Sequence, residues 1–120
     1  MDFYIKKNST LPRLYVEFTQ TGYDVTANDF INRLENADMV FSMQEYSSCI
    51  PKIICSPAKL VEYNKCPDGD CKKYYIEYSF TKKQTSKTGK YKGIFKITFL
   101  DNQEVLIAPI RNELVIHVVE

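Results

Sequence analysis

Apolar and polar side chains alternate along several stretches of this chain. In RLYVEFT, the side chains of Leu14, Val16 and Phe18 share one face of an extended backbone. The same period recurs in three later segments, residues 74–80, 91–99 and 114–119. Because successive side chains of a β-strand point to opposite sides, a period of two predicts strands that each bury one face. The alternation therefore predicts an all-β protein.

Turn-forming residues separate these segments at short intervals. The sequences TQTGYD, CPDGDC, SKTGK and LDNQE carry the Gly, Asn, Asp and Pro that turns require. Their spacing is typical of an antiparallel β-sandwich, for which we expect about seven to eight strands. No repeat, linker or low-complexity tract interrupts the 120 residues, so we predict a single domain over residues 1–120.

One segment, TANDFINRLEN, departs from the alternation. Its apolar residues Phe30, Ile31 and Leu34 fall at helical spacing. Thr26 is placed to cap the first turn, and Asp29 lies near the positive end of a helix dipole. We predict one short helix of about two turns here, lying over an end of the sandwich.

The charge balance gives little reason to expect a nucleic acid or a membrane as partner. The net charge is +1, so no global field attracts an anionic surface. The opening MDFYIKKNSTLPRL lacks the apolar core of a secretory signal, and no apolar run has the length of a membrane span. We therefore expect synthesis in a cytosol and no membrane partner.

Lysines gather in one part of the chain. Six of them lie between Glu77 and Asp101 with no acid among them: Lys82, Lys83, Lys87, Lys90, Lys92 and Lys96. Such a run indicates either a phosphate-binding patch or a solvated loop whose lysines also keep strand edges from pairing with other chains. Near-neutrality of the whole chain favours the solvated loop, so nucleic acid is not expected as a partner.

Four cysteines, Cys49, Cys55, Cys66 and Cys71, occupy the middle of the chain. Free thiols that pack as small apolar groups are favoured, because a reducing cytosol keeps cysteines unpaired. A zinc site formed by all four stays open, although neither pair has the two-residue spacing of a zinc knuckle. A disulfide between Cys66 and Cys71 across CPDGDC also stays open.

No group of residues predicts catalysis. The single histidine, His117, falls in the last alternating segment, opposite the core residues of that segment. The sequence contains no Gly-rich phosphate loop, and its carboxylates are scattered without a pair placed for acid–base work. We therefore predict that the protein is not an enzyme and needs no cofactor, with zinc at the cysteines as the one alternative.

Several aliphatic residues fall opposite the core residues of their strands. They are Ile94, Leu100, Leu106, Val115 and Val119. A sandwich whose outer faces are both wetted by water has no need of them, and a helix of two turns is too short to cover them all. We therefore predict that these residues form an interface with another protein or with a copy of this chain.

The C-terminal half also shows a recognisable order of elements. An apolar strand precedes a Thr-rich turn, G-x-Y-x-G-x-F, an alternating strand, a D-N turn, an apolar strand that ends in Pro, and a last strand of alternating aliphatics. The residues that carry this order are Gly89, Tyr91, Gly93, Phe95, Phe99, Asp101, Asn102, Pro109, Leu114, Ile116 and Val118. It resembles the immunoglobulin-like domain at the N-terminus of phage baseplate upper proteins and in related small virion proteins of tailed phages. The opening FYIKKNSTLPRLYVEF and the segment ADMVFSM are similar to the same family, from which the short helix and the cysteine-bearing segment depart.

The resemblance implies an immunoglobulin-like antiparallel β-sandwich without an active site. It also implies a structural component of a bacteriophage virion, in the tail or baseplate or as a head accessory protein, that docks on other virion proteins after synthesis in the bacterial cytoplasm. Two alternatives stay open. Tyr23, Tyr46 and Tyr63 lie near predicted turns and suit a module that binds carbohydrate or a host surface. The four cysteines suit a small zinc-stabilised binding protein.

Overall fold

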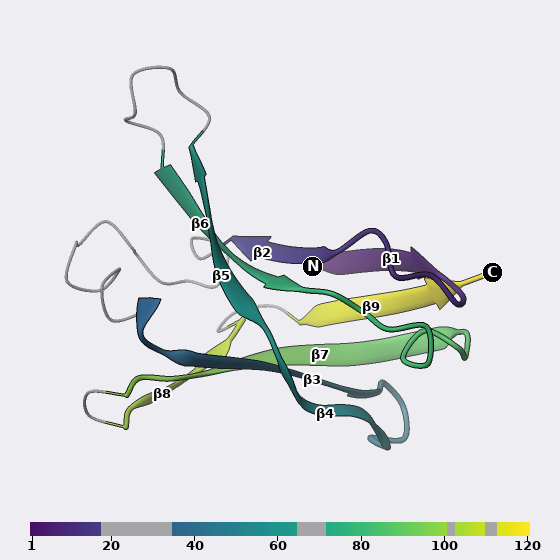
Figure 1. The fold of residues 1–120 in the computed structure, drawn as a ribbon. Helices are drawn as coiled ribbons and strands as arrows, with labels where there is room; N and C mark the ends of the chain where they lie inside the picture. Colours follow the sequence, from purple (N-terminus) through teal and green to yellow (C-terminus); the bar gives the residue numbers. More distant parts are fainter. Residues whose placement is uncertain (18–34, 65–71, 101–102, 110–112) are drawn as a thin grey trace.

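The computed structural model describes residues 1–17, 35–64, 72–100, 103–109 and 113–120 of the chain. These residues form nine β-strands, which are β1 (Asp2–Lys6), β2 (Leu14–Glu17), β3 (Asp38–Glu45), β4 (Pro51–Pro57), β5 (Lys59–Asn64), β6 (Lys72–Tyr78), β7 (Gly89–Thr98), β8 (Val105–Ala108) and β9 (Leu114–Val119) (Figure 1). The predicted all-β class is therefore confirmed.

The segment in which the sequence predicts a helix lies outside the described residues. It contains Thr26, Asp29, Phe30, Ile31 and Leu34. Within the described ranges, no helix has the length and apolar character needed to cross a membrane.

The described strands form two sheets. The larger sheet has the order β1-β9-β7-β3-β4, with β8 also paired to β7, and the smaller sheet has the order β2-β6-β5 (Figure 1). All pairs are antiparallel except β1 with β9, where Asp2 to Lys6 run parallel to Val115 to Val119. The expectation of a purely antiparallel sandwich is wrong at this one edge.

Strands β8 and β9 are two parts of one interrupted strand along β7. Strand β8 pairs with Phe95–Thr98, and β9 pairs with Gly89–Gly93 of the same strand. On the other edge of β7, Tyr91–Thr98 pair with all of β3. The interruption near Pro109 explains why the described residues contain more strands than the turn spacing predicts, since proline cannot donate to the ladder.

The core lies between the sheets and is built around the ring of Phe41. This ring is fully buried, with its centroid 4.5 Å from that of Tyr78 and 4.9 Å from that of Phe95. On its other side it contacts Gly93 of β7, whose missing side chain leaves the space that the ring fills. The remaining apolar side chains of the inner faces surround this contact, as their alternation predicts.

A buried tyrosine fixes the loop that leads into β7. The hydroxyl of Tyr91 donates to the carbonyl oxygen of Lys87, 2.9 Å away and four residues upstream. The same loop is tied to the β1–β2 connection by buried Thr85, whose hydroxyl donates to the carbonyl oxygen of Ser9 at 2.8 Å. Burial also raises the pKa of Tyr91 above its ordinary value, so the hydroxyl stays protonated and remains a donor.

Replacing Gly93 by alanine should overpack the core. A Cβ atom at this position would lie 2.9 Å from two ring carbons of Phe41 and 3.3 Å from Leu114 Cδ2. Because the ring is enclosed by other aromatic side chains, we expect Gly93→Ala to lower the free energy of unfolding by about 1–3 kcal/mol. Urea denaturation measures this loss. In a Phe41→Leu background the same change should cost less, and an equal cost in both backgrounds would contradict the contact.

Removing the hydroxyl of Tyr91 should leave the carbonyl group of Lys87 without this partner. We expect Tyr91→Phe to lower the free energy of unfolding by about 1–2 kcal/mol, which is the usual cost of orphaning a partly buried acceptor. Tyr4→Phe is the matched control, because Tyr4 lies exposed on β1 and its change should cost less than about 0.5 kcal/mol. Equal midpoints for the two variants would show that the Tyr91 bond contributes nothing.

Candidate functional site

The outer face of the larger sheet carries a group of exposed aliphatic side chains. Residues paired across neighbouring strands point to the same side, and here Ile94 of β7 lies beside Ser42 of β3 while Ile107 of β8 lies beside Lys96 of β7. Ile54 of β4 is 76% exposed, and Ile94 and Ile107 are 38% and 44% exposed. A sheet face turned to water alone would carry polar residues at these positions.

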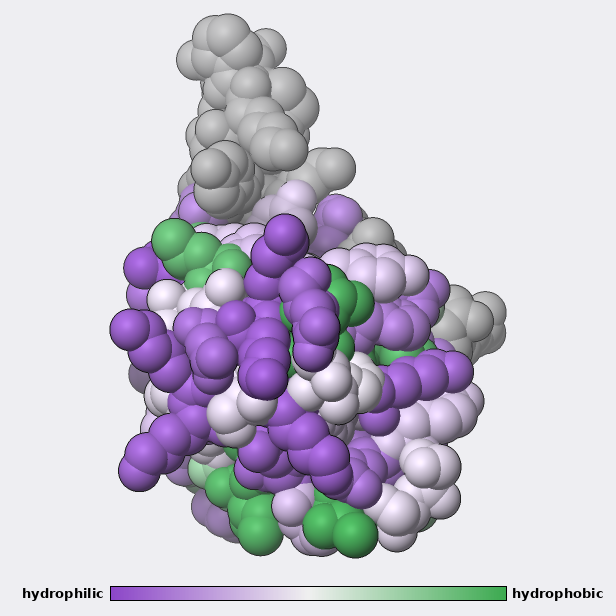
Figure 2. All heavy atoms as spheres, turned by 90° about the vertical axis from the view of Figure 1, so that its right-hand side faces the viewer, coloured by the Kyte–Doolittle hydropathy of each residue, from purple (hydrophilic) through white to green (hydrophobic). Residues whose placement is uncertain are grey.

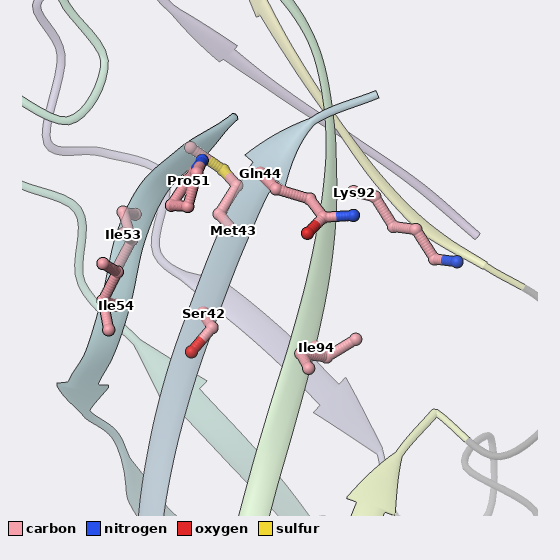
Figure 3. A pocket seen from close by; sticks show the side chains of 8 residues that line it. All are labelled: Ser42, Met43, Gln44, Pro51, Ile53, Ile54, Lys92 and Ile94. Atoms are coloured by element: carbon pink, nitrogen blue, oxygen red, sulfur yellow. The ribbon is translucent and has the colours of Figure 1, made fainter. Parts of the chain in front are cut away.

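A groove crosses β4, β3 and β7 in this outer face and has a volume of about 450 Å³. Figure 3 shows Ile53 and Ile54 along β4 on one side, Ile94 on β7 on the other, and Ser42 on β3 between them. The small side chain of Ser42 is what leaves the space between the isoleucines. The full lining consists of Ser42, Met43, Gln44, Pro51, Ile53, Ile54, Lys92 and Ile94. We call it the β4–β3–β7 groove.

A network of polar side chains covers the neighbouring part of the same face. Tyr46 donates its hydroxyl to Glu113 Oε2 at 2.7 Å, and Lys92 Nζ lies 3.6 Å from Glu113 Oε1. The amino group of Lys90 sits 4.0 Å from the ring centroid of Tyr46. The hydrogen bond from Tyr46 holds the pKa of Glu113 below its ordinary value, and the carboxylate in turn raises the pKa of Tyr46. The polar groups of Tyr46, Lys90, Lys92 and Glu113 therefore have their interaction partners within this network.

His117 lies at the edge of this network and joins β9 to β1. Its Nε2 atom is 2.9 Å from Asp2 Oδ1, and its ring stacks on that of Tyr4 with centroids 4.5 Å apart. This hydrogen bond holds the pKa of Asp2 below its ordinary value. The histidine is on the outer side of its strand, as predicted, but it is half-buried under its neighbours.

Of the five predicted interface residues, three are exposed and two are buried. Ile94, Leu100 and Val119 are exposed, and their role in an interface stays a prediction. Leu106 and Val115 are each only 8% exposed. A complete interface of these five residues therefore does not exist on the surface of the described chain.

Leu106 points into the core, so the expectation that it faces outward is wrong. The β7–β8 turn pairs Leu106 with Ile97, which is a core residue, and this pairing turns Val105 and Ile107 outward instead. The left-handed backbone of Gln103, with φ 61°, belongs to the turn that sets this register. A shift of one residue moves every side chain of a strand to the other face, and the sequence alone did not fix it.

Val115 does face outward, but the chain itself covers it. Its neighbours in register are Asp2 on β1 and Lys92 on β7. Lys92 and Tyr46 are both held over this region by Glu113. Because the polar network occupies its surroundings, Val115 is a buried residue of the outer face and not a free contact residue.

Three exposed residues of the outer face were missed by the sequence analysis: Ile54, Val105 and Ile107. In β4 the signal was hidden because PKIICSP does not alternate, and its pairing with β3 shifts register twice between Phe41 and Gln44. In β8 the run VLIA is apolar on both faces, so it has no alternation from which the direction of each side chain could be predicted. An apolar run on a strand at the periphery of a sheet was the available signal.

The cysteines show no metal site within the described part of the chain. Cys49 and Cys55 are exposed free thiols, whereas Cys66 and Cys71 lie outside the described residues. Among the described residues, no three or more His, Cys, Asp or Glu side chains are grouped as metal ligands. The amide of Cys55 donates to Ser42 Oγ at 3.0 Å, which places this thiol beside the groove.

The lysine-rich segment is a solvated surface with internal partners. Figure 2 shows this end of the sandwich covered mainly by hydrophilic side chains. Lys82, Lys83 and Lys87 of the segment are exposed. Lys87 Nζ lies 3.2 Å from Glu45 Oε1. Hydrogen bonds from Ser48 and Lys87 lower the pKa of Glu45. These contacts favour the interpretation as a solvated loop.

A buried carboxylate on the smaller sheet is paired with two cationic side chains. Glu77 of β6 is 4% exposed, with Oε1 3.2 Å from Arg13 Nη1 and Oε2 3.8 Å from Lys59 Nζ. The two cations come from either side of β6, so they hold the carboxylate between them. This arrangement suits a structural ion pair and offers no free base for catalysis.

Comparison with known proteins yields no relative. No family model matches the chain, and no curated protein or solved structure matches it significantly. The function is therefore inferred from the molecule's own geometry and from the sequence pattern.

Removing the hydroxyl of Tyr46 should raise the pKa of Glu113 toward its ordinary value of 4.5. A carboxyl whose pKa is lowered by folding stabilises the fold above its ordinary value, and the effect is lost as pH falls through the lowered value. Tyr46→Phe should therefore weaken the pH dependence of stability below about pH 4.5. Carboxyl ¹³C NMR titration measures the shift.

Tyr15→Phe is the control for this titration, because Tyr15 lies on the smaller sheet and contacts the ring of Tyr75. The Glu113 titration should be unchanged in that variant. If Tyr46→Phe also left it unchanged, the hydrogen bond would not be the cause of the lowered pKa.

Proposed function

We propose that the β-sandwich is immunoglobulin-like. A sheet of order β1-β9-β7-β3-β4 faces a sheet of order β2-β6-β5, which matches the strand arrangement of that fold when β3 and β7 are its third and sixth main strands. Tyr91 near the start of β7 bonds to backbone four residues upstream, as the tyrosine corner of that fold does. Gly93 and Phe41 occupy the positions of its second cysteine and core tryptophan.

We propose that the protein is a non-enzymatic docking module, which binds a partner protein or a copy of itself through the outer face of the larger sheet. The observation that carries this proposal is the neighbouring exposure of Ile54, Ile94 and Ile107 on one rigid face, beside the β4–β3–β7 groove. Grouped exposed aliphatics of this kind mark interaction sites, because water contact with them is unfavourable. The self-satisfied network around Glu113 supplies a polar rim, as protein interfaces have.

The sequence resemblance supports a place for this module in a tailed-phage virion, as a tail, baseplate or head accessory protein. In that setting the partners are other virion proteins or copies of the chain itself, and no cofactor is needed. The opposed sheets and the tightly packed Phe41 give a rigid unit suited to assembly. Carbohydrate binding is not favoured at Tyr46, since its ring is contacted by Lys90 and its hydroxyl is bound to Glu113. Tyr23 and the side chain of Tyr63 lie outside what the structure describes, so their role stays a prediction.

A charge placed on the outer face should abolish incorporation into particles. We expect tagged wild-type protein, produced during particle formation, to co-sediment with purified tailed-phage particles, and Ile107→Asp to stay in the soluble fraction. Quantitative mass spectrometry of the particle band measures the difference, for which we expect at least a tenfold loss.

Leu11→Asp is the matched control, since Leu11 is an exposed aliphatic in the β1–β2 connection and belongs to no strand of this sheet. It should be incorporated like the wild type. Absence of the wild-type protein from particles would contradict the virion proposal. Equal incorporation of Ile107→Asp would contradict the docking face.

A further inference from the structure

We propose that the occupant of the β4–β3–β7 groove is Ile54 from a second copy of this chain, in a two-fold face-to-face dimer. This inference rests on the proposed docking function and names the partner of the same face. In each copy Ile54 projects from the rim of a groove whose opposite wall is Ile94 and whose floor is Ser42. A two-fold interface requires one patch to carry both a projection and the hollow that receives it.

The projecting side chain and the groove that would receive it are both apolar. Ile54 is the most exposed of the large apolar side chains described, at 76%, and Ile53, Ile94 and Pro51 are among the residues that line the groove beside it. In the dimer, Ile54 of one copy would lie against Ile94 of the other, and the reverse contact follows by symmetry. Both isoleucines would leave water together, which is the gain that drives such association.

The size of the face suits a dimer. The larger sheet is five strands across, about 24 Å at the usual strand spacing, and β7 has ten residues, which span about 34 Å. The other strands of the sheet are shorter, so the face offers on the order of 650 Å², close to the roughly 800 Å² that each partner contributes to an interface of standard size. The aliphatic residues extend from the β4 edge to β7 and β8, and Lys92 and Glu113 of the polar network lie to one side of them as a rim.

The features of strand β4 favour contact through the face over the addition of another strand at the sheet edge. Strand β4 is the sheet edge next to the groove, but Pro51 and Pro57 close its two ends and Cys55 has a positive φ of 48°. These features hinder the addition of another strand at that edge, so contact through the face is preferred.

Sedimentation equilibrium over a wide concentration range tests the dimer. Wild-type protein should show a monomer–dimer equilibrium, and Ile54→Asp and Ile94→Lys should each raise its Kd by at least about 30-fold. Leu11→Asp should leave Kd unchanged. Thermal melting checks that the variants are folded, and both changed positions are exposed, so we expect similar midpoints.

Mixing the two variants distinguishes a two-fold dimer from other modes of association. An Ile54→Asp copy and an Ile94→Lys copy restore one Ile54–Ile94 contact and create one Asp–Lys pair, so their equimolar mixture should dimerise although each alone is monomeric. Site-resolved alkylation gives a second readout, because Cys55 lies beside the groove and should react more slowly in the dimer. In Ile54→Asp this protection should disappear.

Three results would overturn the inference: a wild-type monomer at all concentrations, a dimer that neither variant weakens, or a mixture that stays monomeric. Particle incorporation is measured separately. A monomer that is incorporated would leave the docking function standing with a foreign occupant of the groove. A dimer that is never incorporated would confirm the inference and contradict the virion role.

Discussion

The ring of Phe41 lies against the backbone of Gly93, and much of the structure depends on this contact. It joins β3 to β7 at the centre of the larger sheet, and on its other side the ring meets Tyr78 of the smaller sheet. Because glycine has no side chain, an aromatic ring can fill the space between the two layers at this point. The contact therefore fixes the separation of the sheets and the register of β3 on β7.

From this centre the outer face follows as a geometric consequence. With Phe41 and Phe95 facing inward, their neighbours Ser42 and Ile94 must face outward, since side chains alternate along a strand. The shallow floor at Ser42 and the wall at Ile94 are thus set by the same register that builds the core. A rigid core and a rigid docking surface are two sides of one sheet, which suits a protein that acts through its shape.

The sequence predicted what depends on period alone. Alternation predicted the strands and the inward direction of Tyr91, Phe95, Ile97 and Ile116, all of which are buried. It misplaced Leu106, because a turn of uncertain length sets the register of β8. It missed Ile54, because the irregular pairing of β4 with β3 removes the period that would have shown its direction. It also predicted Val115 as a contact residue, although this side chain is only 8% exposed between its neighbours Asp2 and Lys92, which only the folded sheet brings beside it.

Native-state hydrogen exchange followed by NMR tests the central role of the β3–β7 pair most directly. If the Phe41–Gly93 contact is the centre of the fold, the amides of β3 and β7 should exchange only when the whole molecule unfolds. Their exchange free energies should then equal the free energy of unfolding from denaturation, while the amides at the β4 edge exchange faster. Exchange in β3 and β7 that is faster than in the smaller sheet would contradict the account.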